Sequence, residues 1–329
     1  MRRTASIIVI AALCLLTFAL SLCIGENGLS ISQLLNISSL NSDSVEYIIF
    51  SELRLPRTLI ALSVGALLGA SGIIMQTVFR NPLVEPYTLG VSGGALVGVA
   101  ICISMGLSGI LNGNGNMIFA LLGSLASIFF IANPFSIGFS KQTSSSHILL
   151  SGIVFSFVSS AITTLLLSLS TREQMSSIIS WSIGGFEGAS TGVAYSCTTI
   201  ALVFLALAPF LGNLLNILLL GSVDAHTLGI RTSISVPVVL AVASCLSAVC
   251  VASAGVIAFI GMVVPHFTIA LVGQDRRLSL PCSMLLGASI LLLCDIVARH
   301  IIFPQELPVG VITGLLGGIM FLWINYRKA

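Results

Sequence analysis

Charge is what this sequence has least of. Only 7% of its 329 residues are Asp, Glu, Lys or Arg, whereas 56% are apolar and the mean hydropathy is +1.12. A soluble domain carries about 25% charged residues, so the polar groups here are too few to coat a globule of this size. The formal net charge of +2 is also too small to indicate a polyanionic partner. A water-soluble enzyme, a nucleic-acid reader and a disordered chain are therefore excluded, and an integral membrane protein is indicated.

The sequence also lacks the motifs of nucleotide, hydrolytic and metal chemistry. Its only lysines are Lys141 and Lys328, and neither follows a glycine-rich loop, so there is no phosphate-binding GxxxxGK[ST] motif. No HExxH motif occurs, the four histidines are scattered, and the eight cysteines form no CxxC pair. We expect a chain that is not an enzyme and that holds no metal or cofactor of its own.

Long apolar runs predict an all-α chain that crosses the membrane about ten times. A crossing takes about 20 residues, since each residue of a helix rises about 1.5 Å through about 30 Å of hydrocarbon. The segment 233–273 has no charged residue and is twice that length, so it is expected to fold as a hairpin that breaks at 253–255. The predicted spans are 6–24, 56–79, 88–108, 117–137, 147–169, 191–211, 234–253, 256–273, 279–302 and 308–326.

The positions of Lys and Arg predict the orientation. Cytoplasmic segments of membrane proteins carry the excess of positive charge, so the majority side marks the inside. Placing both termini in the cytoplasm leaves only Arg54, Arg57, Arg172 and Arg299 outside. Nine positive residues then lie inside, namely Arg2, Arg3, Arg80, Lys141, Arg231, Arg276, Arg277, Arg327 and Lys328.

Glycines spaced four residues apart predict close packing between helices in lipid, where small residues let backbones approach. Such pairs or triplets occur at Gly65 and Gly69, at 90, 94 and 98, and at 310, 314 and 318. Tight bundle packing is the preferred interpretation for all of them.

Two groups of charged residues lie in or beside predicted spans. Asp295 and Arg299 are four residues apart, so they share a helix face and can pair. A charge in a membrane is costly and marks either a pathway or a structural ion pair, and the two interpretations have equal weight here.

Arg54 and Arg57 flank a proline at the outer mouth of the second span. They are either interfacial anchors or, together with Arg299, a positive rim that faces an acidic partner.

The predicted cytoplasmic segment 212–233 carries signals for a short helix. Ser222 is expected to cap its N-terminus, Asp224 favours the first turn, and Gly229 closes the C-terminus. A short capped helix between two spans is either a simple turn or a knob that fits a groove of a partner.

Motifs over almost the whole chain resemble the FecCD-type permeases, the membrane subunits of binding-protein-dependent ABC importers for iron–siderophores, haem and cobalamin. The first half contains RLPRTL (54–59), NPLVEP (81–86) and LGVSGGA (89–95). The second half contains LLLGSVDAHTLGI (218–230), GVIAFIGMVVPH (255–266), GQDRR (273–277), LLCDIVAR (292–299) and QELPVGVITGLLG (305–317). The motifs follow the order of the family and together are highly specific.

The resemblance implies a type II ABC importer permease fold, a single transmembrane domain over 1–329 in the inner membrane. It implies a homodimer with the path for a metal chelate along its interface, two cytoplasmic ATPase subunits that bind ATP and Mg, and an external substrate-binding protein. By the same resemblance, Arg54, Arg57 and Arg299 match the positions that dock the binding protein. The coupling helix maps to Ser222, Val223, Asp224, Ala225, His226, Thr227, Leu228 and Gly229, beside a cytoplasmic loop with Asn81, Pro82, Glu85 and Pro86.

The leading hypothesis for the mechanism is alternating access driven by the ATP cycle of the partner. The candidates for the gate are the fifth span, 147–169, and the following segment 172–188, where Gly184 and Gly185 permit a sharp turn. The alternative is a proton- or sodium-coupled secondary transporter, for which Asp295 would have to serve as the relay. An intramembrane enzyme or a sensor ranks lowest, since the chain has no paired nucleophile and no soluble signalling domain.

Overall fold

The computed structural model describes residues 2–24, 44–109, 114–132, 145–302 and 305–326, and these ranges contain helices but no strand. Lys141, Arg327 and Lys328 lie outside the described residues. The helices are α1 (Arg2–Cys23), α3 (Val45–Ile48), η2 (Ile49–Arg54), α4 (Leu55–Phe79), η3 (Pro86–Leu89), α5 (Val91–Ser104), α7 (Gly115–Ala132), α8 (Ser145–Leu169), α9 (Arg172–Ile183), α10 (Thr191–Leu220), α11 (Ser222–Thr227), α12 (Thr232–Ala254), α13 (Ile260–Val272), α14 (Arg276–His300) and α15 (Val309–Tyr326).

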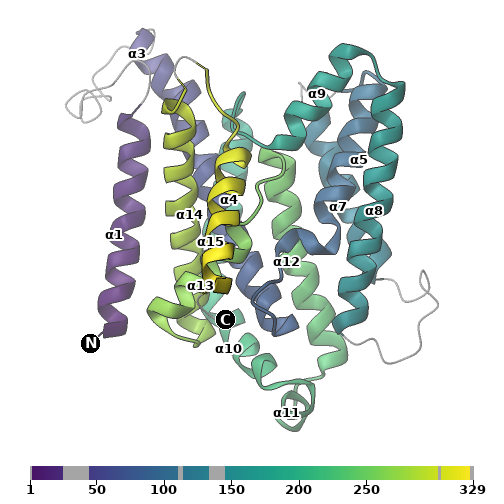
Figure 1. Cartoon of the computed structure of the whole chain (residues 1–329). Coiled ribbons are helices and arrows are strands. Elements are labelled where there is room, and N and C mark those ends of the chain that lie inside the picture. The colour runs from purple at the N-terminus through teal and green to yellow at the C-terminus, as the bar shows by residue number, and fades with distance from the viewer. Residues whose placement is uncertain (1, 25–43, 110–113, 133–144, 303–304, 327–329) are drawn as a thin grey trace.

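Each of the ten predicted spans falls on one of these helices, which confirms the polytopic helical fold. Within the described residues, six apolar helical segments are long enough to cross a membrane, and four more apolar helices are shorter. The predicted hairpin is also confirmed, since α12 ends at Ala254 and Gly255 follows with a φ of +69°. Figure 1 places the start of α1, the end of α15 and the small helix α11 toward one end of the bundle, and α3 and α9 at the other. Which end faces the cytoplasm stays a prediction.

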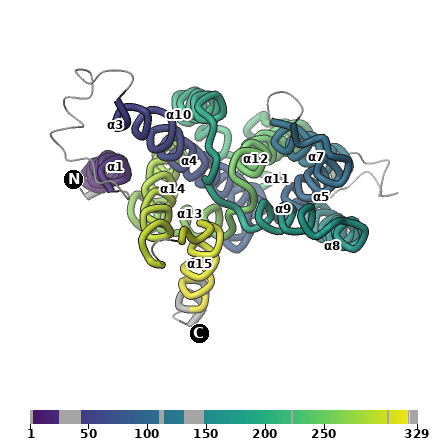
Figure 2. The backbone as a smooth tube through the Cα atoms, turned by 90° about the horizontal axis from the view of Figure 1, so that it is seen from above, coloured from purple at the N-terminus to yellow at the C-terminus, as the bar shows by residue number. Residues whose placement is uncertain are grey.

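The central helix is α4, which is buried along nearly its whole length and packs against α10, α12, α13 and α14. In the view from above, α4 lies inside the bundle, while α1 and α8 lie at opposite edges and α15 projects away from the body (Figure 2). Since lipid is as apolar as this core, backbone contact supplies much of the packing. A methyl group at Gly65 would overlap the main chain of Gly287, and one at Gly69 would overlap the carbonyl of Ser283.

The glycine prediction is confirmed at most of these sites but is wrong at two of them. Gly94 and Gly98 face the main chain of α7, and Gly310 faces the last residue of α9. By contrast, Gly314 and Gly318 have no neighbouring atom within 4 Å of a built Cβ. Both lie on α15, the helix that projects from the bundle, so their spacing serves no contact within the described chain (Figure 2).

Two predicted spans are shorter in the structure because their helices begin inside the bundle. α5 has 14 residues and α13 has 13, so each extends only about 20 Å. Gly261, at the start of α13, lies against Gly72, which is seven residues before the end of α4 and so about 10 Å from that end. Non-helical backbone at this depth is tolerated only where protein surrounds it, and Gly255 and Ile257 of the preceding segment are buried.

Candidate functional site

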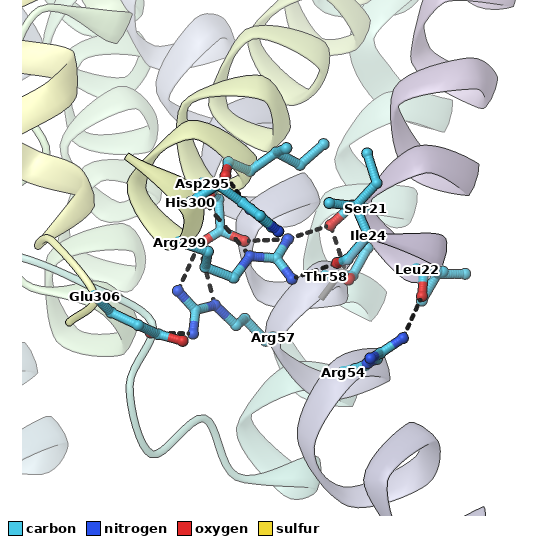
Figure 3. A network of polar contacts seen from close by, with 11 residues as sticks. Ser21, Leu22, Ile24, Arg54, Arg57, Thr58, Asp295, Arg299, His300 and Glu306 are labelled. Carbon is cyan, nitrogen blue, oxygen red and sulfur yellow. Dashed lines mark hydrogen bonds and ion pairs between the residues drawn. The ribbon is translucent and has the colours of Figure 1, made fainter. Parts of the chain in front are cut away.

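At the end of the bundle that is predicted to face outward, four charged residues from distant parts of the chain form one network (Figure 3). Nε and Nη2 of Arg57 donate to Oδ1 of Asp295 at 3.0 and 2.9 Å, and Nη1 donates to Glu306 at 2.6 Å. Nη2 of Arg299 lies 2.9 Å from the other carboxylate oxygen of Asp295. The Asp295–Arg299 pair is therefore confirmed, and Asp295, which is fully buried, compensates two arginines.

The arginines also tie α1 to this network (Figure 3). Arg299 donates to Ser21 Oγ at 3.0 Å and to the carbonyl of Ile24 at 3.3 Å, and Arg54 donates to the carbonyl of Leu22 at 3.2 Å. The last turn of a helix exposes carbonyl groups without intrahelical partners, so cations are favoured there. Arg54 and Arg299 thus satisfy the end of α1 and join it to η2 and α14.

The structure brings Arg54, Arg57 and Arg299 together, but it corrects the idea of an exposed positive rim. Arg54 is 6% exposed and Arg299 is 9% exposed. The side chain of Arg57 is 13% exposed and that of Glu306 is 31% exposed. These guanidinium groups are buried because helix ends and carboxylates of the same chain surround them. Glu306 was not predicted as part of this group, since it lies between the predicted spans 279–302 and 308–326.

The predicted cytoplasmic loop divides into an exposed part and a buried part. Asn81 accepts a hydrogen bond from the main chain of Leu83 at 2.9 Å, and Pro82 is exposed like Leu83. Glu85, however, turns inward and accepts a hydrogen bond from the main-chain N–H of Phe259 at 2.6 Å. Pro86 is buried in the adjoining turn. The second half of the loop is therefore turned into the bundle, where Glu85 supplies an anion to the N-terminus of α13, and the cytoplasmic placement of the loop stays a prediction.

Phe259 is held in an unusual backbone conformation by these contacts. Its φ is +69°, which is rare for a bulky residue. Its side chain fills the space that a methyl group on Gly317 of α15 would need. The side chain of Gln76 donates to the carbonyl of Met262 at 3.0 Å, so α4 also fixes this turn. The segment 84–90 therefore packs against the start of α13 through Glu85 and Phe259. The side chain of Phe259 in turn lies against Gly317 of α15.

The predicted coupling helix forms as α11, at the end of the bundle opposite α3 and α9 (Figure 1). Its start differs from the prediction, because Gly221 is the N-cap and Ser222 is the first helical residue. Its end is as predicted. The N–H of Gly229 donates to His226 at 3.0 Å and that of Ile230 donates to Ala225 at 3.0 Å, which is a Schellman motif with Gly229 at a φ of +84°.

The coupling segment is shorter than the predicted range 212–233, because α10 continues as a helix to Leu220. Ala225 is buried, whereas Asp224, His226, Thr227 and Leu228 are exposed. The Arg80 guanidinium fills the space that a side chain at Gly221 would need, so the loop after α4 touches the start of α11. The two cytoplasmic predictions thus concern neighbouring parts of one surface.

The predicted gate segment forms α9, which begins with a capping box between Thr171 and Gln174 and ends at Gly184 with a φ of +75°. A cavity of about 510 Å³ lies beside it, lined by polar side chains that include Ser176, Ser180 and Glu187. No group of three His, Cys, Asp or Glu side chains in the described parts of the chain could hold a metal ion. The wall of this polar cavity therefore contains residues of α9.

Comparison with known proteins assigns the family. The model of the FecCD transport family matches residues 13–327. The chain is 35% identical over 322 residues to the vitamin B12 import system permease protein BtuC of Klebsiella pneumoniae, covering 96% of this chain and 92% of that protein. It is 36% identical over 308 residues to the hemin transport system permease protein HmuU of Yersinia pestis, covering 92% and 90%.

A solved structure agrees with this assignment. It is described as a "metal-chelate type ABC transporter" in "an inward-facing conformation", and it matches with a TM-score of 0.86 and 31% identity over 98% of both chains. Sequence, family model and three-dimensional structure therefore agree over nearly the whole length. The chain is a member of the FecCD transport family.

Proposed function

We propose that this chain is the permease subunit of an ABC importer that moves a metal chelate, an iron–siderophore, haem or cobalamin, across the inner membrane by ATP-driven alternating access. The observation that carries the proposal is the family match over 13–327, together with relatives named for vitamin B12 and hemin import. The absence of a phosphate-binding loop in the sequence fits a chain that takes its energy from separate ATPase subunits.

The proposed ATPase contact is the surface that α11 and the exposed loop after α4 form. Leu228 is 58% exposed and Leu83 is 55% exposed, and Asp224 and His226 add polar groups. Exposed apolar side chains at the end of a bundle, flanked by polar groups, suit a groove on a partner. Two ATPase subunits, one beneath each permease, would bind ATP and Mg and push this surface as they close.

The proposed partner at the outer end is a substrate-binding protein with acidic contact residues. Because Arg57 and Arg299 are already paired with Asp295 or Glu306, an acidic residue of that protein has to compete there with a carboxylate of this chain. Arg57 is the reachable member, since its partner Glu306 is partly exposed. Reversing the charge at Arg54 and Arg57 together is expected to weaken docking, and more so at low salt. Unchanged docking and uptake would leave these arginines as structural residues only.

The proposed dimer partner is a second copy of the chain, seated on the face that contains α15. This helix projects from the bundle (Figure 2), and Leu315, Ile319 and Leu322 on it are 62–70% exposed. Gly314 and Gly318 lie on the same helix with open space around them, so another helix can approach closely. Cysteines introduced at 314 or 318 should crosslink two copies in the membrane, and a failure at both sites would place the dimer face elsewhere.

A proton-coupled carrier is less well supported than ATP-driven import. Asp295 is held by two arginines and Glu85 accepts the main-chain N–H of Phe259, so both carboxylates have structural partners. A relay needs a carboxylate that can exchange protons with the path. Uptake that persists when the proton gradient is dissipated with ATP intact would support the importer, and uptake that stops would support the carrier.

The central experiment is reconstitution of the permease in proteoliposomes with its ATPase and binding protein. Uptake of haem, cobalamin and a ferric siderophore is measured separately, with and without enclosed ATP. We expect ATP-dependent uptake of one chelate class, and accessibility of cysteines at 176 and 180 in α9 that changes between ATP states. Uphill transport by the permease alone would refute the proposal, and unchanged accessibility would remove α9 as the gate.

A further inference from the structure

The inner end of α14 contains a buried arginine with no counterion. Arg276, the first residue of the helix, is 5% exposed, and its Nε and Nη1 atoms are buried without a hydrogen-bond partner. It forms no ion pair with any residue in the described ranges. Burying an uncompensated charge is strongly destabilising, so the presence of this side chain calls for an anion.

The carboxylate of Asp275, the preceding residue, is already engaged by other donors. Asp275, the N-cap of α14, accepts from the Asn216 amide at 2.7 Å and from the main chain of Arg277 at 3.1 Å. The amide oxygen of Asn216 in turn accepts from the main chain of Arg276 at 2.8 Å. The helix N-terminus is thus capped through its main chain, while the guanidinium of Arg276 remains outside this set of bonds.

A second donor without a partner lies on the same face of α14. The hydroxyl oxygen of Ser279 is fully buried and makes no hydrogen bond in the structure. Residues three apart are neighbours on a helix surface, so this hydroxyl and the guanidinium of Arg276 can serve one ligand. The positive end of the α14 dipole lies at the same place and also favours negative charge.

We propose that Arg276 and Ser279 bind a phosphate group at the inner end of α14, supplied by an anionic phospholipid headgroup or by free phosphate. A guanidinium suits this ligand because its planar array of N–H donors matches phosphate oxygens in pairs. Arg276 is 5% exposed and Ser279 is fully buried, so a broad protein surface cannot reach both of them. Arg277, which is exposed, and Arg3, whose guanidinium lies beside Gly273, add positive charge nearby.

The test compares the melting temperature of the purified, delipidated full-length chain with three additions. These are inorganic phosphate, phosphatidylglycerol, and phosphatidylcholine as the zwitterionic control. A ligand at a concentration of about one hundred times its Kd should raise the melting temperature by about 4 °C, if the chain has the average unfolding entropy of globular proteins. We expect phosphate and phosphatidylglycerol to raise it and phosphatidylcholine to have less effect. A response to phosphatidylglycerol without one to free phosphate identifies the lipid as the source.

The variants separate this site from general lipid effects. Arg276→Met should abolish the response, and Arg277→Met, its exposed neighbour, should retain it. Ser279→Ala, which removes one small group, should weaken binding several-fold and serves if Arg276→Met fails to fold. An equal rise with phosphatidylcholine, or an undiminished response in Arg276→Met or Ser279→Ala, would overturn the proposal.

Discussion

Replacing Asp295 by Asn tests the central claim about the outer network. The change keeps the shape of the side chain but removes the negative charge that Arg57 and Arg299 share at 2.9 Å each. Glu306 can still pair with Arg57, but Arg299 then keeps only neutral acceptors. The two guanidinium groups would also repel one another across a buried site.

The expected cost is large, because removal of one partner of a buried ion pair destabilises a protein by about 3–5 kcal/mol. The average unfolding entropy of globular proteins is about 2.1 cal/mol/K per residue, so the 329 residues give about 0.7 kcal/mol/K. The melting temperature should therefore fall by about 4–7 °C. Arg299→Met placed in the same chain should restore part of this loss, since it removes the charge that was left alone.

The assay is thermal unfolding of the purified permease in one detergent, with Asp224→Asn as the matched control. Asp224 lies exposed on α11, so its change removes the same charge without affecting a buried pair. Equal shifts for the two variants, or no partial rescue by Arg299→Met, would refute the view that Asp295 compensates buried arginines.

Three further predictions concern other parts of the chain. Glu306→Gln should strengthen docking of an acidic binding protein, because it frees the guanidinium that Glu306 now holds, and weaker docking in a binding titration would argue against competition. Gly72→Ala should disrupt the bundle, since its methyl group would overlap main chain of α13, whereas Gly314→Ala should leave the melting temperature of a detergent-solubilised monomer unchanged. The Asn216 amide lowers the pKa of Asp275 from its ordinary value of 3.8. The stability that this bond adds is present above pH 3.8 and is lost as the pH falls toward the lowered pKa of the folded state. The destabilisation by Asn216→Ala should therefore be present at pH 7 and smaller at pH 3, and a cost that does not change with pH would contradict it.

The sequence alone supported the membrane class, the ten helices and the Asp295–Arg299 pair. These features are local, because a span is a sum of hydrophobicity over about 20 residues and an i, i+4 pair lies on one helix. Turn chemistry is local as well, and it placed the hairpin at 253–255 and the end of α11 at Gly229.

The burial of charge was decided only by the tertiary structure. Arg57 and Asp295 are 238 residues apart, and no spacing in the sequence connects them. The tertiary structure also decides that Glu85 turns inward toward Phe259, and that two nitrogen atoms of Arg276 are buried without a hydrogen-bond partner. In a membrane protein the lipid-facing and core-facing residues are both apolar, so the hydrophobic pattern does not show which side of a helix faces inward. The partner of each charged group is therefore fixed by how the helices pack, which only the three-dimensional structure contains.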